Sequence, residues 1–256
     1  MDEIILVTIA KFEEQYIEEW VNWHKNLGFD RIIFYDNNPL ENKDQYNILK
    51  PWIDSEYVVY KDFRGIEKAQ MKAYKDSLNF PSEYVAFFDL DEFLYVDCNL
   101  KEYIGKFNKF DCIRLPWIVY TDNNLVYNSF EPVLERFTEY VQNLDDEFKF
   151  PYKGIYKQCA LNIDKMNSPH RLGVKKVCDQ YGKELGYWDI PTINVERTHL
   201  KHFMFKTAEE TYSKIHKGDV LFGNDPRTKL IPRFFKVNIY SDIKNDILNG
   251  HFIFTR

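Results

Sequence analysis

The feature that most constrains this 256-residue chain is a series of apolar runs separated by segments of helical periodicity. The strand-like runs occupy residues 4–10, 31–35, 57–60, 84–88 and 112–115. The helical patterns fill the intervals, at residues 13–27, 43–53, 67–78 and 100–107. Because parallel strands need a long crossover, usually a helix, these units predict an α/β, Rossmann-like fold with a mainly parallel central sheet.

The regular alternation ends near Pro116, and residues 116–156 are rich in Asn, Asp, Tyr and Pro. Further strand-like pieces are expected at residues 134–138, 156–163 and 195–203. A helix is predicted over residues 207–217, since Thr207 as N-cap and Glu210 three residues later match a capping box. The second half is therefore expected to be irregular, with fewer complete strand–helix units.

We expect residues 1–217 to form one domain and residues 218–256 to form a C-terminal extension packed on it, with a helix at residues 242–248. The stretch Arg233-Phe234-Phe235-Lys236 in this extension has two interpretations, contact with a membrane surface or a buried strand. Lys214 and Lys217, near the end of the preceding helix, are predicted to be surface lysines.

Composition excludes several classes of protein. A net charge of −6 and a pI near 5.6 argue against nucleic-acid binding, which favours a basic face. The four cysteines are widely spaced without a CxxC pair, so a zinc site is not expected. Asp2 and Glu3 precede the first apolar run, unlike a signal peptide, and no run of about 18 apolar residues occurs. A cytoplasmic location is therefore expected.

Acidic residues follow the predicted strands. In parallel α/β sheets, ligands bind beyond the carboxyl ends of the strands. We therefore expect the residues just after each strand to line one crevice; these are residues 11–13, Asp36, Asp62 and residues 89–92.

The cluster Asp89-Leu90-Asp91-Glu92 comes directly after an apolar strand. If the backbone stays extended, both aspartates project from one face while Leu90 points into the core. Two hard oxygen donors there suit a divalent cation that holds a diphosphate, and a cation also relieves their mutual repulsion. The alternative is that these acids only solvate a turn; the apolar residues on both sides favour the metal interpretation.

Seven stretches of the chain resemble, in order over residues 4–217, bacterial glycosyltransferases of the family 2 type and the related family 92 enzymes. They are Lys11-Phe12-Glu13-Glu14 with Trp20 and His24, Tyr35-Asp36-Asn37, Gln70 with Ala73-Tyr74, Phe87-Phe88-Asp89-Leu90-Asp91-Glu92-Phe93, Glu135-Arg136-Phe137-Thr138, Ser168-Pro169-His170, and His202-Phe203 with Lys206-Thr207 and Glu209-Glu210. One departure stands out, because the family often has Asn where this chain has Phe12.

The resemblance implies a GT-A fold and an inverting transfer of a sugar from a nucleotide donor, usually a UDP-sugar, with Mn²⁺ or Mg²⁺. It also implies a glycan or lipid-linked saccharide as acceptor in cell-surface polysaccharide synthesis. With the cytoplasmic location expected above, the acceptor would be reached from the cytoplasmic side, and residues 233–236 leave peripheral membrane contact as one option. Carried over residue by residue, it gives Glu13 and Asp36 contacts with uracil or ribose, and brings Gln70 and Asp89 to the donor.

His202 is the expected third metal ligand beside Asp89 and Asp91, with His199 as its rival. An imidazole in the ligand set favours Mn²⁺ over Mg²⁺. Lys206 lies just before the predicted helix start, where its charge and the free backbone amides would together bind the donor diphosphate.

The catalytic base is less defined by the sequence. Inverting transfer needs a carboxylate or an imidazole to take the proton of the acceptor hydroxyl. The irregular half offers several candidates, of which His170 and Asp122 are preferred; the others are Glu135 and Asp164.

Two other functional classes remain as alternatives. A metal-dependent nucleotidyltransferase would use the same acidic crevice, although residues 9–13 contain no Gly-rich phosphate loop. A non-catalytic glycan-binding module would account for an aromatic content of 17%. Loss of function in Asp91→Ala would separate a transferase from a lectin.

Overall fold

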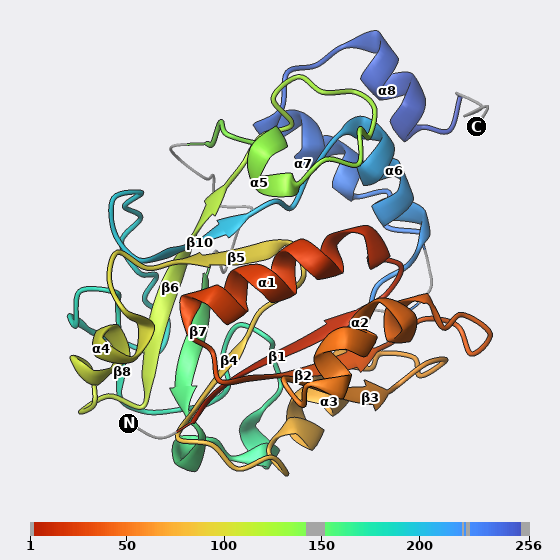
Figure 1. Cartoon of the computed structure of the whole chain (residues 1–256). Helices are drawn as coiled ribbons and strands as arrows, with labels where there is room; N and C mark the ends of the chain where they lie inside the picture. Colours follow the sequence, from red (N-terminus) through yellow and green to blue (C-terminus); the bar gives the residue numbers. More distant parts are fainter. Residues whose placement is uncertain (1–2, 142–151, 222, 224–225, 252–256) are drawn as a thin grey trace.

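The computed structural model describes residues 3–141, 152–221, 223 and 226–251. Over these residues the framework is a curved ten-stranded sheet with helices packed on both of its faces (Figure 1). The main path through the sheet runs β3-β2-β1-β4-β7-β6-β10-β5, and β8 and β9 extend it beside β6.

The N-terminal half of the sheet is parallel, as predicted. Its strands are β1 (Ile4–Ala10), β2 (Arg31–Asp36), β3 (Val58–Asp62) and β4 (Tyr84–Phe87). The connecting helices are α1 (Ile17–Leu27), preceded by the 3-10 turn η1 (Glu14–Tyr16), α2 (Asp44–Asp54) and α3 (Gln70–Ser77). β1 is buried along its whole length, which explains its continuous apolar run.

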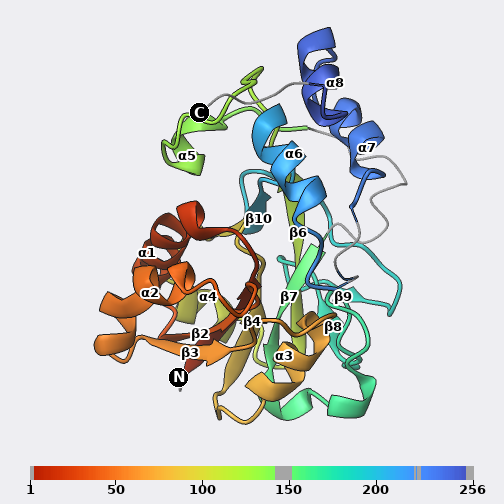
Figure 2. The same ribbon diagram turned by 90° about the vertical axis from the view of Figure 1, so that its right-hand side faces the viewer.

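Side chains of β1 alternate between two cores. Ile4 and Leu6 pack with residues of α1 and α2, whereas Ile5 and Val7 pack with residues of α3. The two groups of helices lie on opposite faces of the sheet (Figure 2). This burial on both faces fixes the register of β1 with its neighbouring strands. It therefore also fixes the position of the residues that follow Ala10.

The other half of the sheet is mixed. β7 (Tyr152–Lys157) runs antiparallel to both β4 and β6 (Cys112–Val119), and β10 (His199–His202) runs parallel to β6. β5 (Glu92–Tyr95) is antiparallel to β10, and the short strands β8 (Val177–Cys178) and β9 (Glu184–Leu185) pair beside β6. The fold is thus mixed α/β, with its parallel strands concentrated in the first half.

The remaining helices gather mostly at one end of the sheet (Figure 1). They are α4 (Leu100–Gly105), α5 (Val133–Arg136), α6 (Ala208–His216), α7 (Leu230–Val237) and α8 (Asp242–Leu248), with 3-10 turns η2 (Gln158–Ala160) and η3 (Ile163–Lys165). α6, α7 and α8 share a small apolar core that includes Phe205, Ile215 and Phe234. The predicted capping box of Thr207 and Glu210 is present at the start of α6.

Several expected elements differ from the observed ones. Residues 133–136 form α5 rather than a strand, because the Glu19 carboxylate accepts hydrogen bonds from the backbone amides of Val133 and Leu134 and so caps a helical turn. The strand expected at 156–163 instead ends at Lys157, and residues 233–236 lie in α7, not in a strand. No helix in the described part of the chain is both long and apolar enough to cross a membrane.

Candidate functional site

A pocket of about 610 Å³ opens at the carboxyl ends of β1 and β4, beside β6, β10 and α6. Its walls include Asp89, Asp91, His170, His202 and Lys214. A site at the carboxyl ends of parallel strands is where the sequence predicted one. The irregular second half of the chain forms the opposite wall.

The turn after β4 has a different shape from the extended one that we expected. The Glu92 amide donates to the Asp89 carbonyl at 3.0 Å, so residues 89–92 form a tight turn. Leu90 still points into the core, with 1% of its surface exposed. Because the turn rotates the two carboxylates away from a common face, Asp89 and Asp91 acquire different partners.

Asp89 lies against a buried ammonium group. Its Oδ2 is 2.9 Å from Nζ of Lys153 on β7, and its Oδ1 accepts a hydrogen bond from Gln70 at 3.1 Å. Lys153 also lies 3.7 Å from the fully buried carboxylate of Glu92. Burial alone would lower the pKa of Lys153, but Asp89 and Glu92 raise it well above its ordinary value, so the ammonium stays charged.

Asp91 is buried between a lysine and a histidine. Its Oδ2 is 2.6 Å from Nζ of Lys214 on α6, and its Oδ1 is 3.5 Å from Nε2 of His202 on β10. Burial would raise the pKa of Asp91, but Lys214, His202 and Lys206 together hold it well below its ordinary value. The pocket therefore presents a permanent anion at Asp91.

The geometry of Asp91 and His202 suits a shared divalent cation. Two donors bound to one ion at about 2.1 Å lie roughly 3–3.5 Å apart, and Oδ1 of Asp91 and Nε2 of His202 are 3.5 Å apart. Within the described residues, no three His, Cys, Asp or Glu side chains are grouped to hold an ion, so Asp89 does not complete the expected trio. Two protein ligands suffice where phosphate oxygens and water complete the coordination, which is common for Mg²⁺.

The expected crevice of strand-end residues forms only in part. Glu13, Gln70, Asp89 and Asp91 line the larger pocket. Asp36 does not, because its carboxylate is buried and accepts hydrogen bonds from the Tyr60 hydroxyl at 2.8 Å and the Asn38 amide at 2.9 Å. Asp62 is also outside the pocket and pairs with Arg64.

A second, smaller pocket of about 300 Å³ adjoins the first, and Lys206 lines this one rather than the larger. The Lys206 ammonium lies 4.1 Å from the ring centre of Tyr16, and burial lowers the pKa of Lys206 to about 8. At the start of α6 the Glu210 carboxylate already accepts hydrogen bonds from the Thr207 amide and hydroxyl. The Glu210 carboxylate therefore lies at the helix start beside Lys206, and diphosphate binding by Lys206 stays a prediction.

The two preferred base candidates lie in different places. His170 lines the larger pocket, its Nδ1 is 3.0 Å from the Tyr152 carbonyl, and burial beside Lys153 lowers its pKa to about 4. Asp122 is 1% exposed and pairs with Lys244 on α8 at 2.6 Å. Asp122 does not line the larger pocket and instead anchors α8, so His170 is the better placed of the two.

The sequence missed the cations of the site. Lys214 and Lys217 were predicted to be surface lysines, which is wrong, since Lys214 pairs with Asp91 and Lys217 lies 3.2 Å from Glu13. Lys214 follows the buried Glu210 by four residues, and Lys217 follows Lys214 by three, so helical periodicity places both on the buried side of α6. This spacing could have been recognised in the sequence. Lys153 lies in an irregular stretch and gives no comparable signal.

Comparison with known proteins shows that the model of glycosyltransferase family 92 matches residues 7–235. A family 92 protein of Ricinus communis is 26% identical over 101 residues, which cover 38% of this chain and 18% of that protein. A family 92 protein of Arabidopsis thaliana is 29% identical over 105 residues, covering 36% of this chain and 16% of that protein. The matched segments thus span less than a fifth of these curated relatives.

Among solved structures, residues 1–349 of S. aureus TarS in complex with UDP-GlcNAc match at a TM-score of 0.48 and 14% sequence identity. The match covers 99% of this chain and 74% of that chain.

Proposed function

This chain belongs to glycosyltransferase family 92, and from that premise we propose that its larger pocket binds a nucleotide-sugar, a UDP-sugar, and transfers the sugar to a glycan or lipid-linked saccharide. The observation that carries the proposal is the grouping of Asp89, Asp91 and His202 with Lys153 and Lys214 at the carboxyl ends of β1 and β4. Such a group of opposite charges suits a diphosphate leaving group and the cation that accompanies it.

The lysines would stabilise the charge that develops on the diphosphate. Lys214 in α6 and Lys217 at its C-cap line the pocket wall, where low solvent access strengthens their attraction for phosphate oxygens. Asp91 and His202 would hold the divalent cation, Mn²⁺ by preference for an imidazole ligand, and the cation would act as a Lewis acid on the diphosphate. Glu13 and Gln70 would orient the nucleoside.

An inverting transfer forms a bond from the acceptor oxygen to the anomeric carbon while the bond from that carbon to the diphosphate breaks. UDP leaves with the bonding electrons, and the acceptor hydroxyl loses its proton to a base. His170 is our candidate, because its imidazole lines the pocket and is neutral near pH 7, so it has a lone pair to accept that proton.

The sequence resemblance supports the product, and the expected cytoplasmic location supports the side of the membrane. We propose that the sugar enters a cell-surface polysaccharide, assembled on the cytoplasmic side with peripheral contact to the membrane. The acceptor would approach from the irregular half of the chain, which forms the wall opposite the strand ends.

The proposal is tested by thermal-shift and calorimetric titration of UDP, GDP and CDP, each with and without Mn²⁺. UDP is expected to bind most tightly, Mn²⁺ is expected to strengthen its binding, and UDP-sugars should be slowly hydrolysed. Absence of binding by all three nucleotides would remove the proposal. Release of pyrophosphate from UTP and a sugar 1-phosphate would instead favour a nucleotidyltransferase.

A further inference from the structure

The second pocket lies between η1, α6 and the loop around residues 128–130. It shares four lining residues with the larger pocket: Glu13, Met204, Lys214 and Lys217. A molecule in the second pocket would therefore lie next to one in the first, separated only by these side chains. Apart from these shared side chains, no residue that lines the second pocket has a role in the donor binding proposed above.

Two exposed phenylalanines line this pocket. Phe130 is 78% exposed and Phe12 is 42% exposed. Both adopt positive φ angles, 63° for Phe130 and 51° for Phe12, a conformation that is a genuine outlier for a bulky side chain. Among the described non-glycine residues with positive φ, these two alone are hydrophobic. The chain thus bears a conformational cost to hold two rings in solvent. Because the rings are exposed, little hydrophobic burial offsets this cost.

Hydrogen bonds from the surroundings hold the backbone of Phe12. Its amide donates to Oδ1 of Asn38 at 2.7 Å, and Nδ2 of Asn38 donates to the Glu14 carboxylate at 2.6 Å. Asn38 is itself fully buried, so the support is rigid. None of the roles proposed for the donor site involves Phe12.

The backbone of Phe130 is held in a similar way from the other side of the pocket. Its amide donates to Oδ1 of Asn128 at 2.9 Å. Asn128 is fixed by two partners, since its Nδ2 donates to Gln15 at 2.8 Å and its amide donates to Glu209 at 2.8 Å. The loop that carries Phe130 is therefore tied both to the η1 segment and to α6.

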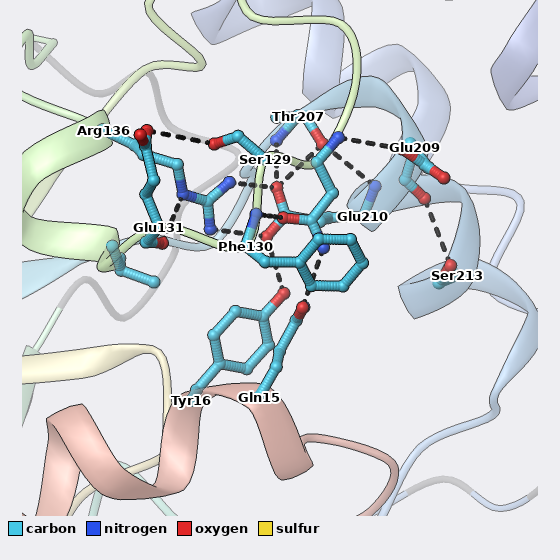
Figure 3. Close-up of polar contacts among 12 residues, drawn as sticks. Gln15, Tyr16, Ser129, Phe130, Glu131, Arg136, Thr207, Glu209, Glu210 and Ser213 are labelled. Carbon is cyan, nitrogen blue, oxygen red and sulfur yellow. Dashed lines mark hydrogen bonds and ion pairs between the residues drawn. The ribbon is translucent and has the colours of Figure 1, made fainter.

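The pocket is lined by polar groups whose positions are also fixed. The Tyr16 hydroxyl donates to Glu210 at 2.7 Å, and Arg136 pairs with the same carboxylate through two hydrogen bonds (Figure 3). The lysines at the border with the larger pocket face carboxylates, Lys214 with Asp91 and Lys217 with Glu13. Four carboxylates and three ammonium groups line this pocket: Glu13, Glu14, Glu209 and Glu210, and Lys206, Lys214 and Lys217. Because these charges nearly balance, the pocket suits a ligand without net charge.

We propose that the second pocket is the acceptor site and that Phe12 and Phe130 stack on the ring of a neutral sugar. The C–H face of a pyranose packs against aromatic rings, while its hydroxyls bond to carboxylate, amide and hydroxyl side chains such as Glu209, Gln15 and Ser213. Fixing both rings in advance reduces the entropy lost on binding. This inference rests on the proposed function, because an acceptor sugar needs a nucleotide-sugar donor in the adjoining pocket, from which the second sugar is transferred to it.

The test uses the full chain without nucleotide and a set of neutral disaccharides, namely lactose, cellobiose, maltose, gentiobiose and chitobiose, detected by saturation-transfer NMR. At least one should receive saturation at its ring protons, with an affinity that falls fivefold or more in Phe130→Gly and in Phe12→Ala. Phe130→Gly also relieves the positive φ, so its melting temperature should not fall. Tyr127→Ala, in the same loop but not lining either pocket, is the matched control and should bind as the wild type does.

The same proteins are titrated with UDP in parallel. Binding of UDP unchanged within twofold, together with loss of the disaccharide signal in Phe130→Gly, supports the acceptor site. No disaccharide binding by the wild type, or equal binding by Phe130→Gly, overturns it. Absence of UDP binding in the wild type contradicts the proposed function instead, and the two failures are thereby distinguished.

Discussion

The Nζ atom of Lys153, inside β7, lies 2.9 Å from Oδ2 of Asp89, at the turn that follows β4. The Lys153 side chain is 1% exposed, and the Glu92 carboxylate, 3.7 Å from the same Nζ, is fully buried. The Lys153 ammonium therefore forms ion pairs with two carboxylates, Asp89 and Glu92, at the edge of the larger pocket. Burial raises the pKa of Glu92 well above its ordinary value, and removal of the ammonium takes away the charge that opposes this shift.

We expect Lys153→Met to lower the free energy of unfolding by about 3–5 kcal/mol, the usual cost of removing one member of a buried pair. Urea unfolding measures this loss, and the affinity for UDP should fall with it. Lys157→Met is the control, because Lys157 lies in the same strand but is partly exposed; its effect should be below about 1 kcal/mol. Equal stability of the two variants would contradict the role given to Lys153.

His202 and His199 lie on the same short strand, β10, but only His202 lines the larger pocket. We expect His202→Asn to reduce the gain in UDP affinity that Mn²⁺ produces by about tenfold or more, the scale of loss seen even for groups that only support a metal ligand. His199→Asn should keep that gain, because the His199 ring packs on Tyr95 instead. Calorimetry with and without Mn²⁺ decides, and an unchanged gain in His202→Asn would remove this residue from the metal site.

Arg136 and Glu210 form a buried pair with two hydrogen bonds, of 2.8 and 2.9 Å. We expect Arg136→Met to cost about 3–5 kcal/mol of stability, since the Glu210 carboxylate is left in the interior without its main partner. The double variant Arg136→Met with Glu210→Gln should recover part of this loss, because it removes the unpaired charge.

An exposed pair provides the comparison for this prediction. Lys50 and Asp54 lie 2.8 Å apart on the surface of α2, and more than half of each side chain is exposed. Lys50→Met should leave the free energy of unfolding close to that of the wild type, because solvent screens an exposed pair. An equal loss of unfolding free energy in Lys50→Met and Arg136→Met would show that burial does not determine the contribution of the Arg136 pair.

His24 is fully buried between α1 and β5, and burial lowers its pKa to about 3. Its Nδ1 faces the Trp20 carbonyl at 2.9 Å and its Nε2 accepts from the Leu94 amide at 3.3 Å, which fits only a neutral ring. The unfolded chain binds a proton below about pH 6.5, whereas the folded chain does not until about pH 3. Stability from this group is therefore complete above pH 6.5 and is lost as the pH falls below it.

We expect the wild type to lose about 2 kcal/mol through His24 between pH 7 and pH 5. Urea unfolding at these two pH values measures the change. His24→Gln should be less stable at pH 7 but should lose less on acidification, whereas His216→Gln, at an exposed position, should keep the wild-type dependence. The same pH dependence in His24→Gln would contradict this assignment.

The elements that local pattern specifies were predicted well. The apolar run of residues 4–10 and the stop at Gly28 gave β1 and α1, and the pair Thr207 and Glu210 gave the start of α6. The capping box of α6 depends on contacts within a few residues. The apolar run of β1 depends only on burial of the strand on both faces. The position of Asp89 and Asp91 at the strand ends followed from the topology.

Errors arose where a distant group decided the local structure. Residues 133–136 form a helical turn because Glu19, more than 100 residues away, caps their amides. Asp122 is an anchor for α8 rather than a pocket residue because Lys244 reaches it from the C-terminal part of the chain. No pattern within either stretch contains that information.

The sequence by itself determined the α/β framework, the edge of the sheet at which the larger pocket opens and the acids that follow β4. Only the tertiary structure decided which cations meet those acids, Lys153 at a separation of 64 residues and Lys214 at 123. The reason is physical: hydrophobic periodicity records which face of an element is buried, and that is a local property. The pairing of charges depends on which elements pack together, and only the tertiary fold determines that packing.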